Sequence, residues 1–268
     1  MTDVRVAILR IEGTNCEDET ERAFREAGAL PEKIHLNQLT GHAPLEMRRT
    51  LEDYDVLMFP GGFSAGDYVR AGALFGARLR ASLGREIRDF VEDGRPVLGV
   101  CNGFQVLIEL GLLPGFEEVM SPRPTAVLAP NDSGRFECRP TFLRYSGAST
   151  PFTGGLEPED VIYAPSAHAE GKLILEDNSL DRLFENGQVV FTYVDPDGEP
   201  GGFPWNPNGS PRDVAGICNP AGNVLGMMPH PERSVHRHLH PEGWRGVRDD
   251  EWGDGFRLFR SVVDALGG

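Results

Sequence analysis

The sequence contains no run of apolar residues long enough to cross a membrane. About 18 consecutive apolar residues are needed for a membrane-spanning helix, and no run among the 268 residues approaches that length. Basic residues are also few, with 26 Lys and Arg against 41 Asp and Glu, and they form no cluster. Nucleic acids and anionic membranes bind clustered basic side chains. The net charge of −15 therefore predicts neither partner and favours solubility instead.

Cysteine is scarce as well, with four residues in the chain. Small secreted domains that rely on disulfides are rich in cysteine, and the N-terminal MTDVRVAILRIEG lacks the apolar core of a signal peptide. We therefore expect free thiols and a location in the reducing cytoplasm. No internal repeat and no convincing linker divides the sequence, so we expect a single domain over residues 1–268.

Apolar β-rich runs alternate with segments of helical periodicity through the first half. The predicted strands are 4–11, 33–39, 54–62 and 95–100, and the predicted helices are 16–28, 77–94 and 102–113. This alternation is typical of an α/β fold whose parallel sheet has helices on both faces. The second half favours antiparallel strands added at one edge, in 125–130, 136–145, 160–175 and 188–195. A hairpin over 213–232 and a helix over 255–266 complete the prediction.

One cysteine lies between two glycines within an apolar run, Gly99-Val-Cys-Asn-Gly103. The pattern G-x-C-x-G is the thiol counterpart of the nucleophile elbow G-x-S-x-G, which places the nucleophile at a sharp turn between a strand and a helix. The free N–H groups and the positive dipole end of the following helix favour a thiolate. Because strand, glycines and helix all fall where an elbow needs them, we predict that Cys101 is a nucleophile rather than a buried structural cysteine.

The other cysteines lack part of this pattern. Cys218 lies in the similar sequence GICNP, but Pro-Ala-Gly-Asn follows it, which is a turn composition rather than a helix. Cys16 opens a predicted helix without a glycine on its far side and is a secondary candidate. Cys138 is expected to be an ordinary strand residue.

A nucleophilic cysteine needs a base, and the base needs an orienting group. Among seven histidines, His230 is followed by proline and then by Glu232. Proline favours extended backbone at the preceding residue, and in extended backbone residues i and i+2 point the same way. Taken alone, the His230–Glu232 spacing is explained equally well by two solvent-exposed loop residues. The predicted elbow at Cys101 is what favours a catalytic role for the pair. His168 and Glu170 form an alternative pair with the same spacing.

Three further histidines, His236, His238 and His240, alternate in HRHLH. No cysteine or carboxylate cluster lies nearby, so we predict an exposed polar loop and no metal site.

Paired glycines end the third predicted strand in FPGGFSAGD (59–67). A glycine loop beside an elbow can present backbone N–H groups to an oxyanion, with the N–H of Asn102 as a second donor. A simple turn after a strand explains the glycines equally well when they are considered alone.

Together these residues resemble the class I glutamine amidotransferases, whose glutaminase domain uses an elbow cysteine with a His-x-Glu pair. More narrowly, the sequence is similar to the glutaminase subunits of phosphoribosylformylglycinamidine synthase. The matching segments are EGTNCE (12–17), FPGGFSAGDYVRAGA (59–73), GVCNGFQVL (99–107), HAEGK (168–172), NPNGS (206–210) and GNVLGMMPHPER (222–233). The chain is somewhat longer than expected of this family, and we assign the excess to 198–205 and 236–252.

The resemblance implies a three-layer, flavodoxin-like fold with a mostly parallel sheet and antiparallel edge strands. It also implies roles for seven residues: Cys101, His230 and Glu232 as a triad, Gly62 and Asn102 as an oxyanion hole, and Gly61 and Gln105 as contacts to substrate. L-Glutamine would be hydrolysed to glutamate and ammonia through a glutamyl thioester.

By the same resemblance, the ammonia would pass to a large synthetase subunit. That subunit would use ATP to convert formylglycinamide ribonucleotide to its amidine in purine biosynthesis, and a small subunit would bridge the two. No cofactor is expected in this chain, since ATP and Mg²⁺ would belong to the synthetase. The absence of a G-x-x-x-x-G-K-[ST] loop agrees with that division.

Other functions remain open on the residues alone. The elbow and triad do not distinguish this glutaminase from one that serves another amidotransferase. A cysteine peptidase or chaperone-like protein on a similar sheet would keep the elbow but does not call for a distant His-Pro-Glu.

Overall fold

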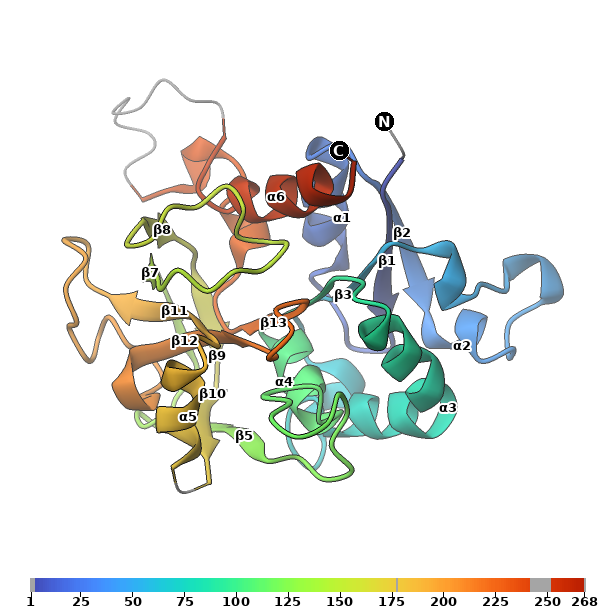
Figure 1. Ribbon diagram of the computed structural model, residues 1–268, viewed down its shortest axis with the longest axis horizontal. Coiled ribbons are helices and arrows are strands. Elements are labelled where there is room, and N and C mark those ends of the chain that lie inside the picture. The colour runs from blue at the N-terminus through green and yellow to red at the C-terminus, as the bar shows by residue number, and fades with distance from the viewer. Residues whose placement is uncertain (1–2, 177, 242–251, 268) are drawn as a thin grey trace.

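The computed structural model describes residues 3–176, 178–241 and 252–267. Its centre is a nine-stranded sheet in the order β2-β1-β3-β4-β13-β12-β11-β7-β8 (Figure 1). The parallel part consists of β2 (Leu30–His35), β1 (Arg5–Arg10), β3 (Val56–Phe59), β4 (Val97–Val100) and β13 (Val224–Met227). The antiparallel part consists of β12 (Val214–Cys218), β11 (Val189–Val194), β7 (Phe142–Tyr145) and β8 (Val161–Tyr163).

Helices cover both faces of the parallel strands (Figure 1). One face carries α1 (Glu17–Glu26) and α6 (Phe256–Gly267), and the other carries α3 (Ala73–Glu92) and α4 (Asn102–Glu109). The rings of Phe24 and Phe259 join α1 to α6 edge-on, with centroids 4.9 Å apart. The parallel strands follow the flavodoxin-like order, so the predicted fold class is confirmed. None of the helices in the described ranges is long and apolar enough to cross a membrane.

Strands β3 and β4 are buried along their whole length. A parallel strand covered by helices on both faces has no solvent side, so its sequence is apolar throughout rather than alternating. This explains why the runs 54–62 and 95–100 predict buried strands correctly, although each observed strand is shorter than the run.

The predicted strand 33–39 is wrong in its second half. Strand β2 ends at His35, and a short helix, α2 (Leu36–Leu39), follows. His35 begins this helix through a capping box: its Nδ1 accepts from the N–H of Asn37 at 3.2 Å, and the side chain of Gln38 accepts from its N–H at 2.9 Å. Local side-chain hydrogen bonds therefore override the apolar alternation.

The second half departs from the prediction in one further respect. Four of its strands leave the sheet edge and form two small sheets: β5 (Ala126–Pro130) pairs with β10 (Glu170–Leu175), and β6 (Glu137–Arg139) pairs with β9 (Ser166–His168). The sequence patterns also do not predict α5 (Ser179–Glu185).

Short 3₁₀ helices complete the described elements: η1 (Leu45–Met47), η2 (Leu51–Asp53), η3 (Ser64–Asp67), η4 (Pro211–Asp213), η5 (Pro231–Arg233) and η6 (Arg237–Leu239). Of the additional segment 236–252, residues 242–251 lie outside the described ranges.

The two glycines that flank position 101 are required by close packing. A Cβ at Gly99 would lie 2.6 Å from Cδ1 of Leu107 and 2.7 Å from the carbonyl oxygen of Gly103. A Cβ at Gly103 would overlap the carbonyl oxygen of Phe59 at the end of β3. Helix α4 therefore starts directly against the two central strands, which is possible only without side chains at these positions.

We expect Gly103→Ala to lower the thermal unfolding midpoint measured by calorimetry. Overpacking of this kind destabilises by about 1–3 kcal/mol, and each kcal/mol shifts the midpoint by about 2–4 °C in a chain of this size. Gly84→Ala in α3 is the matched control, because nothing lies within 4 Å of a Cβ added there. It should raise stability by about 0.5–1 kcal/mol. Equal midpoints for the two variants would contradict the packing argument.

Candidate active site

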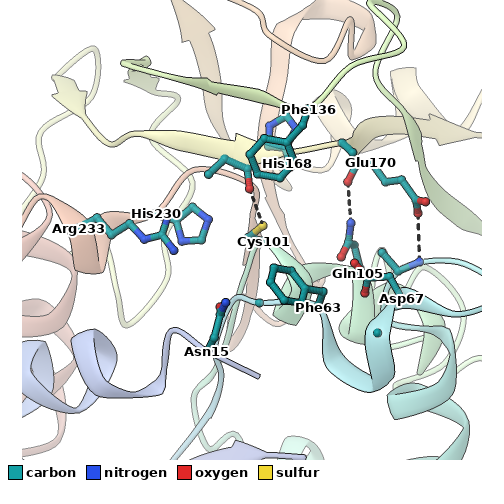
Figure 2. A pocket seen from close by; sticks show the side chains of 15 residues that line it. Asn15, Phe63, Asp67, Cys101, Gln105, Phe136, His168, Glu170, His230 and Arg233 are labelled. Atoms are coloured by element: carbon teal, nitrogen blue, oxygen red, sulfur yellow. Dashed lines mark hydrogen bonds between the residues drawn. The ribbon is translucent and has the colours of Figure 1, made fainter. Parts of the chain in front are cut away.

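Cys101 lies at the turn between β4 and α4, where the sequence predicts an elbow. Its backbone has φ 51° and ψ −108°, and positive φ is uncommon in residues other than glycine. The residue is 5% exposed, and its Sγ lies 3.6 Å from the carbonyl oxygen of Ala167. It lines a cavity of about 420 Å³ (Figure 2). The thiol is therefore shielded from bulk water but open to a small ligand.

His230 reaches the same cavity because β4 and β13 are adjacent parallel strands. Val100 lies opposite Met227, and the N–H of Cys101 donates to the carbonyl oxygen of Met227 at 2.8 Å. The chain then continues for three residues beyond β13 to His230, whose N–H donates to the carbonyl oxygen of Pro165 at 2.8 Å. Both side chains thus emerge at the carboxyl edge of the sheet, where ligands bind in open α/β folds.

His230 is tied to Glu232 by a hydrogen bond of 2.5 Å between Nδ1 and Oε1. Both side chains are buried, at 1% and 0% exposure, and Nε2 of His230 has no hydrogen-bond partner in the described part of the chain. Burial lowers the pKa of His230, but the charges of Glu232 and Cys101 outweigh it and raise the pKa well above its usual value. The imidazole is therefore suited to hold a proton that Nε2 can donate toward the cavity.

The two predicted oxyanion-hole donors come from two elements, the loop after β3 and the start of α4. Gly62 lines the cavity with φ 136°, and the N–H of Asn102 is at the first turn of α4. Neither N–H has a hydrogen-bond acceptor among the residues described. The side-chain Oδ1 of Asn102 accepts from the N–H and Oγ of Ser64 at 3.1 and 2.6 Å, which fixes the loop against the elbow.

The two predicted substrate contacts differ in placement. Gln105 lines the cavity, but its amide is already bonded at both ends: Oε1 accepts from Nδ2 of Asn102 at 2.9 Å, and Nε2 donates to the carbonyl oxygen of Glu170 at 2.6 Å. Gly61 packs behind the cavity, where a Cβ would lie 2.7 Å from Cε1 of His230. Gly61 therefore leaves room for the imidazole.

The alternative pair of His168 and Glu170 is not hydrogen-bonded. The carboxylate of Glu170 accepts from the N–H of Ala71 at 3.1 Å, and Nδ1 of His168 lies 3.1 Å from Oδ1 of Asn131. Both residues nevertheless line the cavity. The i and i+2 spacing does not bring them together because β9 ends at His168 and β10 begins at Glu170.

The other cysteines have different surroundings. Cys218 is buried in β12, and burial raises its pKa to about 11. Cys138 is exposed in β6, as predicted for a strand residue. Cys16 is buried, and its Sγ accepts from Nη2 of Arg233 at 2.9 Å. The sequence patterns do not predict this last contact, which joins residues 217 positions apart.

Cys16, His230 and Glu232 form a group of metal-ligating types within the described residues, with ligand atoms within 4.8 Å of one another. Nδ1 of His230 is already bonded to Oε1 of Glu232, and Sγ of Cys16 already accepts from Nη2 of Arg233. His236, from the histidine-rich segment, instead pairs with Glu26 at 3.2 Å and stacks on His238 and Trp252.

Comparison with known proteins assigns the chain to a family. Residues 3–264 match a family model described as a CobB/CobQ-like glutamine amidotransferase domain. Phosphoribosylformylglycinamidine synthase subunit PurQ from Archaeoglobus fulgidus is 50% identical over 271 residues, covering 98% of this chain and 97% of the relative. PurQ from Picrophilus torridus is 47% identical over 265 residues, covering 99% and 100%.

A solved structure gives the same result. A chain in the structure of PurLQS from Thermotoga maritima superposes with a TM-score of 0.74 at 32% identity, covering 99% of this chain and 100% of that one. The resemblance that the sequence motifs indicate is thereby confirmed: this chain belongs to the PurQ family of glutamine amidotransferases, the glutaminase subunits of phosphoribosylformylglycinamidine synthase.

Proposed function

We propose that this chain hydrolyses L-glutamine to glutamate and ammonia for a phosphoribosylformylglycinamidine synthase. The main support for the proposal is structural: the thiol at the strand-to-helix elbow and the buried His–Glu pair both lie at the same cavity. The PurQ relatives, similar over nearly their whole length, favour this synthase over another amidotransferase.

The first half-reaction forms a thioester. The thiolate of Cys101 attacks the carboxamide carbon of glutamine, and the carbonyl electrons move to oxygen. The N–H groups of Gly62 and Asn102, both without an acceptor among the described residues, stabilise this oxyanion. His230 then donates its Nε2 proton to the nitrogen, the C–N bond breaks, and ammonia leaves. Glu232 keeps Nδ1 protonated and holds the ring in this orientation.

The second half-reaction releases glutamate. Water attacks the thioester carbonyl carbon while Nε2 of His230 accepts its proton, and the same two backbone N–H groups stabilise the second oxyanion. Breaking of the C–S bond frees glutamate and restores the thiolate. The charges around His230 suit both steps, because they favour the imidazolium whenever Cys101 is ionised.

The ammonia serves partner subunits. We propose a large synthetase subunit, which holds ATP and Mg²⁺ and aminates formylglycinamide ribonucleotide, and a small bridging subunit. Support comes from the relatives, which are named as subunits, and from the structure described as PurLQS. All four cysteines are free, and disulfides are rare in the reducing cytosol, so the proposed location is the cytoplasm.

Cys101→Ala should abolish glutamine-dependent synthesis by the reconstituted synthase, with a fall of about 10³-fold or more. Synthesis from added ammonia should persist, because that reaction bypasses the glutaminase. Both rates are measured by formation of the amidine product. Loss of both would mean that Cys101 is structural.

Cys218→Ala is the matched control, since Cys218 is buried in β12 and distant in chain position from the elbow. It should leave glutamine-dependent synthesis nearly unchanged. Release of peptide fragments by the wild-type chain, without ammonia release from glutamine, would favour a peptidase instead.

Glu232→Gln should lower kcat by about 10²- to 10⁴-fold with little change in KM for glutamine. The amide preserves the shape of the side chain but removes the charge that raises the pKa of His230, so the protonated imidazole is less available to the leaving ammonia. Steady-state kinetics with glutamine test this. A rise in KM alone would place Glu232 in substrate binding.

A further inference from the structure

The thiol of Cys16 is a buried group that the proposed mechanism does not use. Cys16 has no exposed surface and is the N-cap of α1, but its side chain makes no capping hydrogen bond. N-cap positions favour Ser, Thr, Asp and Asn, because their side-chain oxygens accept from the first N–H groups of the helix. Helix capping therefore does not explain this side chain, whose contacts lie outside α1.

The thiol of Cys16 is the hydrogen-bond acceptor of Arg233. Nη2 of Arg233 donates to Sγ at 2.9 Å. A guanidinium normally pairs with a carboxylate, but the carboxylate of Glu232, the preceding residue in η5, is bonded to His230. The bond to the thiol joins η5 to a segment 217 positions earlier in the chain. Arg233 and His230 lie on the same side of Cys101 (Figure 2).

Cys16 is also a direct neighbour of His230. A Cβ built at Gly61 would lie 3.1 Å from Sγ of Cys16 and 2.7 Å from Cε1 of His230, so the thiol and the imidazole pack around the same glycine. The ligating atoms of Cys16, His230 and Glu232 all lie within 4.8 Å of one another. The thiol therefore borders both members of the His230–Glu232 pair.

The backbone of Cys16 orients one proposed oxyanion donor. The N–H groups of Asn15 and Cys16 donate to the carbonyl oxygen of Gly61 at 3.5 and 3.3 Å. The peptide bond between Gly61 and Gly62 is trans, so the N–H of Gly62 points opposite to this carbonyl and away from Cys16. Cys16 thus holds the loop after β3 with its backbone and η5 with its side chain.

We propose that Cys16 and Arg233 are positioning residues that hold the Gly62 donor and the imidazole of His230 at a fixed separation. In the tetrahedral intermediate the oxyanion and the departing nitrogen are bonded to the same carbon. The group that stabilises the oxygen and the group that protonates the nitrogen must therefore be placed together. This inference rests on the proposed glutaminase function and concerns how its acid and its oxyanion hole are held.

The experiment measures ammonia release from glutamine by the reconstituted synthase. Cys16→Ala removes the acceptor for Arg233, so kcat should fall by about 10- to 100-fold, the size expected when catalytic groups are misplaced by up to about 1 Å. KM for glutamine should stay nearly unchanged. The thiol of Cys16 also donates to Oδ1 of Asn15 at 3.4 Å, and a serine hydroxyl can both donate and accept. Cys16→Ser should therefore recover most of the lost kcat.

A double variant tests whether the two residues act as a pair. Residues that share one hydrogen bond have non-additive effects, so Cys16→Ala combined with Arg233→Met should be no slower than the slower single variant. Cys218→Ala is the matched control, because Cys218 is also a buried free cysteine but lies in β12. It should keep the kcat of the wild type. Should Cys16→Ala fail to fold, Arg233→Met tests the same bond from its other partner.

The opposing outcomes are distinct. Equal losses of kcat in Cys16→Ala and Cys16→Ser, or additive losses in the double variant, would overturn the inference. A higher KM with unchanged kcat in Arg233→Met would place Arg233, which lines the cavity, in substrate binding and would overturn it as well. Absence of any ammonia release from glutamine by the wild-type synthase would instead refute the glutaminase function itself.

Discussion

The hydrogen bond from the N–H of Cys101 to the carbonyl oxygen of Met227 fixes the site. It is the last rung of the parallel ladder between β4 and β13, two strands that are separated by more than a hundred residues in the chain. Both strands bury apolar side chains on both faces of the sheet. A slip by one residue would turn every side chain to the opposite face, where the neighbouring side chains are not packed to receive it. The relative position of nucleophile and base is therefore determined by the packing of the core.

The sequence predicts the individual elements of this site better than it predicts that they lie close together in space. The elbow follows from Gly99 and Gly103, whose missing side chains let α4 approach β3 and β4. His230 has the extended backbone that Pro231 predicts, but Glu232 lies in the 3₁₀ helix η5, so the hydrogen bond between them spans the start of a helix rather than two residues of a strand. Periodicity does not say which strands are neighbours, so only the family resemblance predicts that Cys101 and His230 lie close together. The sheet order, in which β4 and β13 are adjacent, provides the physical explanation.

Errors in the sequence prediction arise where long-range or side-chain contacts decide the structure. The capping box at His35 converts a predicted strand into a helix. Strands β9 and β10 leave the sheet edge and pair with other segments, which carries His168 and Glu170 to the cavity lining. The contact between Cys16 and Arg233 has no local signal either. The positions of charged side chains around the cavity are therefore set by the tertiary structure. Acidic side chains lie on one side of Cys101 and basic side chains lie on the other.

Asn102 has two roles that are mechanically linked. Its backbone N–H is one proposed donor to the oxyanion, and its side chain holds Ser64, two residues beyond the Gly62 that supplies the other donor. A displacement of the loop after β3 is therefore transmitted to the first turn of α4. Because these hydrogen bonds join the two segments, Gly62 and Asn102 should move together. The distance between their backbone N–H groups then stays nearly constant when the loop moves.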